Sequence, residues 1–257
     1  MFPLTKSFEL VSGNSGSFCV KKTHLSHFWP FQCHYKTTRY VLRGCMEHSS
    51  FLKDMYQCKD IQRFFSDIMG EEVMWHPITW EASHFNIQDN NTPNEPIFDW
   101  HIDSQPFTLL ADFSHYPKNK APEGGCTLLK KNNSEEIMKI NYPEPGFASI
   151  VRASAVIHKA ERANYRRAIY AVSLSQKDFL KVDNSDVLLG AQYSDKEDLF
   201  RQYLNFRLDR IEQQLELAVE NPEVLGQVKD TVSTEMKVTR KFANACFKEN
   251  FKLDNYE

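Results

Sequence analysis

Between Glu72 and Ser175 the chain is a succession of short β-rich runs, and this alternation limits the fold more than any other feature of the sequence. The runs are separated by clusters of turn-forming residues at 90–94, 116–125 and 141–146. Short strands that are interrupted by such clusters are typical of an all-β sandwich or barrel. We therefore predict a β core over residues 72–175.

Helical periodicity flanks this region on both sides. Upstream, Ser49 or Ser50 is placed to cap a helix that runs to about Met69, where Gly70 ends it. Downstream, Ser194 and Glu197 form a capping-box pattern ahead of one apolar stripe. The stripe comprises Phe200, Tyr203, Leu204, Leu208, Ile211, Leu215 and Ala218.

These patterns predict an α+β fold in a single domain over residues 1–257. The C-terminal helical addition covers 194–247, and Asn221-Pro222 separates its two helices. By the layer logic of domains, the terminal helices are expected on the outside of the sheet. A homodimer contact through the C-terminal helices is the alternative interpretation.

Composition excludes several classes of protein. The net charge of −3 does not predict nucleic-acid binding, and no run approaches the ~18 apolar residues of a membrane span. The first residues lack the pattern of a secretory signal. Six cysteines without a Cys-x-x-Cys pair argue against a zinc ribbon or a disulfide framework. We expect a cytoplasmic protein with no nucleic-acid or membrane partner.

The pair His101 and Asp103 carries the chemistry. Residues two apart point in very different directions on a helix but to the same side of a strand. An imidazole beside a carboxylate supplies two ligands for a first-row metal, and iron(II) in oxygenases takes two His and one carboxylate. The best third ligand is His158, where the apolar run from Ser149 ends in a His.

Two further motifs follow the same order along the chain. Residues 122–129 form a Gly-Gly loop that enters a strand, with Thr127 placed to offer a hydroxyl group. Residues 165–172 form a strand that opens with Arg166 and Arg167. A guanidinium group binds a carboxylate through two parallel hydrogen bonds, so either arginine is a candidate anchor for a dicarboxylate.

Together these motifs resemble the iron(II)/2-oxoglutarate-dependent dioxygenase superfamily. The resemblance covers residues 72–175, and its Gly-Gly-x-Thr step is most similar to the taurine dioxygenase branch. It implies a double-stranded β-helix (jelly-roll) core and the cofactors Fe(II), 2-oxoglutarate and molecular oxygen. It also implies that His101, Asp103 and His158 bind iron and act in catalysis, while Thr127 and Arg167 bind 2-oxoglutarate.

The choice between the two arginines depends on strand alternation. Arg166 and Arg167 point to opposite faces of a strand, and Arg167 shares its side with Ile169 and Ala171. We take Arg167 as the anchor, although its spacing of nine residues from His158 is shorter than the family's usual gap. Asp103 also favours oxygenation, desaturation or cyclisation, because family halogenases have a small residue at this position.

The resemblance implies oxidation of a substrate C–H bond, with succinate and carbon dioxide as co-products. Low charge and modest size favour a small molecule, such as an amino acid or carboxylate metabolite. Two alternatives remain: a protein or nucleic-acid hydroxylase or demethylase, and a non-enzymatic jelly-roll binding module. Candidate substrate contacts, each with a structural role as the simpler interpretation, are Trp100, Phe107, Arg152 and Arg162. His84 and His115 are weaker candidates for the mouth of the site.

Overall fold

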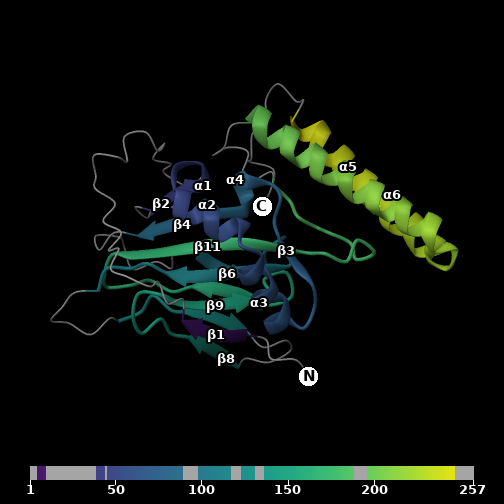
Figure 1. The fold of residues 1–257 in the computed structure, drawn as a ribbon. Coiled ribbons are helices and arrows are strands. Elements are labelled where there is room, and N and C mark those ends of the chain that lie inside the picture. Colours follow the sequence, from purple (N-terminus) through teal and green to yellow (C-terminus); the bar gives the residue numbers. More distant parts are fainter. Residues whose placement is uncertain are drawn as a thin grey trace.

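The computed structural model describes residues 5–9, 39–43, 45–88, 98–116, 123–130, 136–187 and 196–246 (Figure 1). Within these ranges the chain forms two antiparallel sheets. The larger sheet contains β1 (Thr5–Glu9), β2 (Arg39–Arg43), β3 (Val73–Trp75), β4 (Ser83–Gln88), β6 (Phe107–Asp112), β9 (Phe147–Val151) and β11 (Arg167–Gln176). The smaller sheet contains β5 (Phe98–His101), β7 (Thr127–Lys130), β8 (Ile137–Ile140) and β10 (His158–Ala160).

The path of the chain between the two sheets defines a double-stranded β-helix. From β4 to β11 the chain passes back and forth, because β4, β6, β9 and β11 lie in the larger sheet and β5, β7, β8 and β10 in the smaller one. The larger sheet has the order β1-β9-β6-β11-β4-β2, and the smaller has β5-β10-β7-β8. This is a jelly-roll arrangement, in which two facing sheets enclose an interior. The fold class predicted from the sequence is confirmed.

The outer face of the larger sheet is apolar and is covered by short helices. These are α1 (Cys45–His48), α2 (Ser50–Gln57) and α3 (Lys59–Met69). Leu52 and Phe65 from the helices join Leu109, Ile150 and Val172 from the strands in one buried cluster. Burial of this apolar surface holds the helical layer on the sheet.

The N-terminal helical segment begins and ends where the sequence predicts. The Ser49 hydroxyl accepts a hydrogen bond from the backbone of Leu52, and Gly70 ends α3 in the left-handed conformation (φ 71°). The predicted single helix is nevertheless two helices. Cys58 adopts an extended backbone (ψ 110°) between them, where the sequence has neither Gly nor Pro to mark the break.

The inner face of the larger sheet is unusually polar. Along β11, Arg167, Ala171 and Ser173 alternate with the outward Tyr170 and Val172. Neighbouring strands add further buried polar side chains to the same inner face, namely Asn86, Gln88, Thr108, Asp112 and Ser149. A buried polar group is costly unless it is hydrogen-bonded. The interior is therefore built for polar contacts rather than for apolar packing alone.

The C-terminal helices form a hairpin that projects from one end of the sheets (Figure 1). It consists of α5 (Lys196–Glu220), the 3-10 turn η3 (Pro222–Val224) and α6 (Leu225–Cys246). The sequence predicts these helices on the outside of a sheet. They pack instead on connecting segments, through a cluster that includes Ile78, Val187, Tyr203 and Phe242. Ile78 directly precedes α4 (Thr79–Ala82). Ser194 of the predicted capping box lies outside the described residues.

A buried ionic network fixes the base of the hairpin. Arg207 of α5 and Glu235 of α6 form an ion pair at 2.6 Å, and Arg210 bonds the same carboxylate at 2.6 Å. Arg207 also donates to the backbone oxygens of Asp183 and Ser185. All three charged side chains are at least 98% buried. None of the described helices is long and apolar enough to span a membrane.

Loss of one partner from this network should destabilise the fold strongly. Glu235→Ala removes the carboxylate that two buried guanidinium groups share and leaves Arg207 only its longer ion pair with Asp183, at 3.5 Å, which should lower the free energy of unfolding by about 3 kcal/mol. Urea unfolding followed by circular dichroism measures the change. Glu212→Ala, at an exposed position of α5, is the matched control and should shift it by less than ~0.5 kcal/mol. Equal effects of the two variants would contradict this role for Glu235.

Stability should also decrease in mild acid because of His76. This ring is fully buried, accepts from the backbone of Ile78 at Nδ1, and lies 3.0 Å from the Ser185 hydroxyl at Nε2. Burial lowers the pKa of His76 to about 4, while the unfolded chain retains the ordinary value near ~6.5. As pH falls from ~6.5 towards 4, the unfolded state binds a proton that the folded state excludes, so folding loses stability.

Between pH 7.5 and 5, protonation of His76 in the unfolded chain should lower the free energy of unfolding by about 2 kcal/mol. Urea unfolding of the wild type and of His76→Gln at both pH values isolates the contribution of His76 to the pH dependence, because the other histidines are common to both proteins. The variant should show a pH dependence smaller by that amount. An identical pH dependence in the two proteins would show that His76 does not set it.

Candidate functional site: a His-Asp-His cluster at one end of the barrel

The smaller sheet brings His101 and His158 side by side. His101 is the last residue of β5 and His158 is the first of β10, and the two are direct partners in the antiparallel register. Their ring centroids are 4.2 Å apart. A connection through β6, β7, β8 and β9 separates them in sequence, so the closed topology alone makes them neighbours.

Two local details differ from the sequence prediction. The strand with His101 ends there, and Asp103 lies beyond it, where its backbone N–H donates to the Ala153 oxygen at 3.0 Å. The run from Ser149 is not one strand that ends at His158. It ends at Val151, and a turn leads to β10, which His158 begins. The turn carries the chain from the larger sheet to the smaller one.

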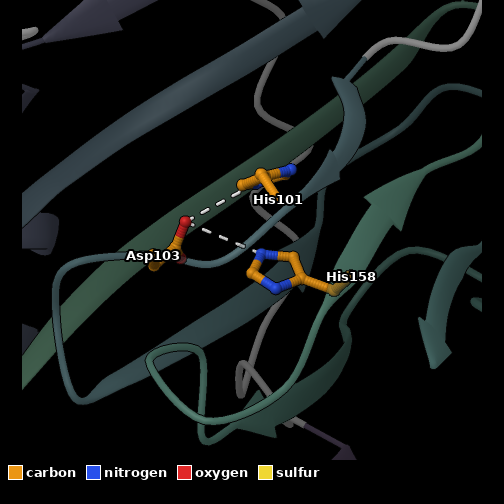
Figure 2. A group of neighbouring side chains, drawn as sticks. All are labelled: His101, Asp103 and His158. Atoms are coloured by element: carbon orange, nitrogen blue, oxygen red, sulfur yellow. Dashed lines mark ion pairs between the residues drawn. The ribbon is translucent and has the colours of Figure 1, made fainter. Parts of the chain in front are cut away.

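Asp103 completes a compact group of three donor atoms. Its Oδ1 lies 3.5 Å from Nε2 of His101 and 3.6 Å from Nε2 of His158. Figure 2 shows one carboxylate oxygen of Asp103 facing both imidazole rings from one side. All three donor atoms lie within 4.8 Å of one another. His158 is mostly buried, whereas 36% of the His101 side chain is exposed, so the group is accessible from one side.

Hydrogen bonds on the far side of each residue orient the three donors. Nδ1 of His101 lies 2.6 Å from the Asp99 carbonyl, and Nδ1 of His158 lies 2.9 Å from that of Val156. A carbonyl only accepts, so each Nδ1 carries a proton, and in the neutral form of each ring the lone pair is on Nε2. The Thr108 hydroxyl donates to Oδ2 of Asp103 at 2.9 Å, which leaves Oδ1 for a ligand.

These donors fit a divalent first-row metal ion. Two neutral imidazole nitrogens and one carboxylate oxygen on one side of an ion leave its other positions open. Backbone or side-chain partners that fix the far atom of each ligand are the usual support of such sites. The three residues that the sequence predicts as ligands thus lie together, with their donor atoms close to one another.

Arg167 lies deep in the barrel, as strand alternation predicts, and Arg166 is exposed. Burial lowers the pKa of the Arg167 guanidinium, which still remains protonated at neutral pH. Its Nε donates to the Gly125 carbonyl at 3.0 Å. This hydrogen bond uses Nε and leaves the two terminal nitrogens out of it. A buried cation with two available donors is suited to bind a carboxylate group.

Hydroxyl groups from two strands, β7 and β9, and from the loop after β8 line the same interior. The Thr127 hydroxyl lies 3.0 Å from that of Tyr142, which lies 3.1 Å from that of Ser149. Burial raises the pKa of Tyr142, so its hydroxyl stays protonated and can donate. Thr127 therefore does offer its hydroxyl inside the barrel, where its described partner is Tyr142.

The sequence analysis did not identify several members of this interior. Thr108, Asp112, Ser149, Tyr116 and Tyr165 are partly or fully buried around the two predicted groups. The Tyr116 hydroxyl lies within hydrogen-bond distance of two acceptors, the Asp112 carboxylate and the Tyr142 carbonyl, and donates its one proton between them. In the sequence, the sign of Thr108, Asp112 and Ser149 is a polar residue at an alternate position of an otherwise apolar strand, in β6 and β9. That signal is visible only once the inward face of each strand is known.

The Gly-Gly turn is required by close backbone contacts. Gly124 and Gly125 have φ values of 73° and 74°, a region that residues with a side chain rarely adopt. A Cβ atom on Gly124 would lie 2.0 Å from the Arg162 carbonyl, and one on Gly125 would lie 2.2 Å from the Tyr165 hydroxyl. The two glycines thus allow the turn that leads directly into β7, which Thr127 begins.

The four predicted substrate contacts do not form one group. Trp100 precedes His101 on β5 and lies against the amino groups of Lys130 and Lys159, at 5.2 and 5.6 Å. The carbonyl of Arg162 accepts from the Gly125 backbone, a structural role.

The other two, Phe107 and Arg152, do come together. The Arg152 guanidinium lies 5.1 Å from the Phe107 ring centroid and pairs with Glu71 at 2.9 Å. Both line a small surface pocket, together with Ser104, Ser154 and Gln176. A role of Phe107 and Arg152 in substrate binding stays a prediction.

Comparison with known proteins gives matches only among solved structures. No family model and no curated protein matches the sequence. A prolyl hydroxylase from Trichoplax adhaerens, solved with a hypoxia-inducible-factor peptide, is 14% identical, with 68% of this chain and 84% of that chain covered and a TM-score of 0.48. HygX from Streptomyces hygroscopicus, solved with nickel and 2-oxoglutarate, is 10% identical, with the same coverages and a TM-score of 0.47.

A third match is an oxidoreductase of the 2OG-Fe(II) oxygenase family from Burkholderia pseudomallei. It is 13% identical, with 67% of this chain and 85% of that chain covered and a TM-score of 0.45. The chain spans only 41% and 60% of the length of two further matched structures. None of these matches points to the taurine dioxygenase branch that the sequence motif suggested.

The Thr108 hydrogen bond gives a test of how the three donors are held. Thr108→Val removes the hydroxyl that orients Asp103 while keeping the shape of the side chain, and should weaken divalent-metal binding about 10-fold. Titration with Co(II), followed by its visible absorption, measures this affinity. Thr234→Val on α6 is the matched control and should bind like the wild type. An unchanged affinity in Thr108→Val would remove Thr108 from the site.

Proposed function

We propose that this protein is a non-haem Fe(II), 2-oxoglutarate-dependent oxygenase that oxidises a C–H bond of a small molecule. The observation that carries the proposal is the orientation of three donors, Nε2 of His101, Nε2 of His158 and Oδ1 of Asp103, by hydrogen bonds on their far sides. A surface His-Asp contact would not need its other atoms fixed in this way. A mononuclear site with open positions is the arrangement that such oxygenases use.

The second support is the buried Arg167. In this proposal its two terminal nitrogens bind the distal carboxylate of 2-oxoglutarate, and the hydroxyl of Thr127 or of Tyr142 adds a hydrogen bond. Arg166 cannot take this role, because its side chain points to the outside. The co-substrate would then extend from the interior of the barrel to the His-Asp-His cluster.

Each part of the chain has a separate task in the proposed reaction. Bound iron would supply the activation of oxygen that protein side chains cannot provide. His101, Asp103 and His158 would hold the ion, and Arg167 would fix the co-substrate so that its other end meets the ion. Asp103 would take one ligand position of the ion, which favours hydroxylation, desaturation or cyclisation over halogenation. We assign the catalytic core to residues 72–175 and the helical addition to residues 194–247.

The substrate class follows from charge. A nucleic-acid substrate calls for a basic surface, whereas the net charge here is −3. We therefore assign a small polar molecule, such as an amino acid or another carboxylate metabolite, and place Phe107 and Arg152 among its contacts. A panel of such metabolites, peptides and oligonucleotides, assayed by succinate release, tests this part. Stimulation by peptides or oligonucleotides alone would overturn the substrate class and leave the oxygenase class standing.

Anaerobic binding of Fe(II) and 2-oxoglutarate tests the site itself. The wild type should form the coloured iron–2-oxoglutarate complex, and His101→Ala or Asp103→Ala should abolish it. Arg167→Met should weaken 2-oxoglutarate binding about 100-fold, because a buried charge pair is lost. Arg166→Met, one residue away and exposed, is the matched control and should bind normally.

Each outcome of this experiment has a definite meaning. A folded wild type that forms no complex would sink the oxygenase proposal. A complex without succinate release in oxygen, for every compound in the panel, would favour the non-enzymatic binding module. Equal affinity in Arg167→Met and Arg166→Met would remove Arg167 from the co-substrate site. Thermal unfolding of each variant separates loss of binding from loss of folding.

A further inference from the structure

Polar and apolar side chains are distributed unusually along α5. Its first turns bury the apolar Leu199, Tyr203 and Phe206. Over the following turns the buried face is polar instead, since Arg207, Arg210 and Gln214 are at most 2% exposed. The opposite face is apolar and open, with Leu208 59%, Leu215 51% and Val219 81% exposed. An exposed apolar row on an otherwise polar element marks an interaction surface.

The apolar residues on α5 follow the spacing of a helix-packing stripe. Leu204, Leu208, Ile211, Leu215 and Ala218 alternate by four and three residues, which is the pattern of helices that pack side by side. Leu225 and Met236 of α6, each 60% exposed, extend the surface to the second helix. We call this set the outer face of the hairpin.

Two rows of opposite charge border the outer face. On α5 the row is acidic, and on α6 it is basic; both rows are exposed, and none of their members forms an ion pair within the described residues. The acidic row is Asp209, Glu212, Glu216 and Glu220, and the basic row is Lys229, Lys237 and Arg240. The helical period of 3.6 residues per turn gives the position of each row around its helix. Across the outer face, the acidic row comes first, then the apolar residues of α5, then the apolar residues of α6, and last the basic row.

We propose that the outer face is the contact of a homodimer, formed by a second copy of this chain. A two-fold axis parallel to the helices would place α5 of each copy over α6 of the other. The acidic row of one copy then meets the basic row of its partner on both sides of an apolar centre. A two-fold axis in the plane of the contact but perpendicular to the helices would place the two acidic rows against each other. The charge pattern therefore favours the axis parallel to the helices, which gives an antiparallel four-helix bundle.

The size of the surface is adequate for a stable contact. A helix of 25 residues is about 37 Å long, and two helices side by side are about 20 Å wide. The resulting area, on the order of 700 Å², is close to the ~800 Å² per partner of standard interfaces. A membrane surface is a poorer occupant, because the acidic row would face anionic lipids. The proposal is independent of the chemistry in the barrel.

Mass measurement in solution tests the dimer directly. Light scattering after size exclusion, and sedimentation velocity, measure the molar mass at roughly 5–100 µM protein, a range that reveals dissociation constants near micromolar. The wild type should have the mass of a dimer. The double variant Leu208→Glu/Leu215→Glu should be a monomer with wild-type thermal stability. A monomeric wild type would overturn the proposal, as would a wild-type dimer that both substitutions leave intact.

Charge reversal tests the pairing of the two rows. Lys at all four acidic positions (Asp209, Glu212, Glu216 and Glu220) makes both rows basic, and Glu at all three basic positions (Lys229, Lys237 and Arg240) makes both acidic, so each variant alone should dimerise about 100-fold more weakly at low salt. Mixing the two variants should give a heterodimer, and the variant that combines all seven substitutions should restore the homodimer. Failure of both rescues in folded proteins would show that the rows do not face each other. Loss of thermal stability in a monomeric Leu208→Glu/Leu215→Glu would mean that the chain's own residues cover the face.

Discussion

The register of β10 between β5 and β7 is the constraint on which the rest of the site depends. His158 pairs with His101 on one side and with Leu129 on the other, and Ala160 pairs with Thr127. Because side chains alternate along a strand, this register sends both imidazoles and Thr127 into the interior. A slip of one residue would turn His158 outwards and separate it from Asp103. Closure of the two sheets therefore fixes the donor geometry before any ligand is present.

The two faces of the larger sheet divide the work of stability and function. The outer face and its helices form the main apolar cluster, which contributes the burial needed to fold. That allows the inner face to carry Arg167, Thr108 and Ser149, which would be a poor core by themselves. The buried Arg167 is tolerated because its Nε is paired and hydroxyl groups surround it. A carboxylate ligand would complete its set of partners.

The sequence predicted the parts of this site that depend on short spacing. The alternation of β-rich runs predicted the fold class. A His-x-Asp step, a Gly-Gly-x-Thr step, the His after the run from Ser149 and one of two adjacent arginines predicted the five site residues, which are His101, Asp103, Thr127, His158 and Arg167. What it missed depends on tertiary geometry. The end of β5 at His101 and the turn after Val151 arise where the chain crosses between sheets. The Thr108 bond to Asp103 requires strand registers that no local pattern contains.

The hairpin illustrates why an apolar stripe alone does not tell which face of a helix is buried. The periodic stripe of α5 predicts an inward apolar face, yet much of it faces outward and a charged network faces inward. The network is stable there because Arg207 and Arg210 share one carboxylate and donate to backbone oxygens, so the cost of burying them is offset by several hydrogen bonds. Such a network also fixes the angle of the helices, since its bonds are directional. An outward apolar stripe on a rigidly held helix remains available to a partner, which a stripe folded onto the sheet would not be.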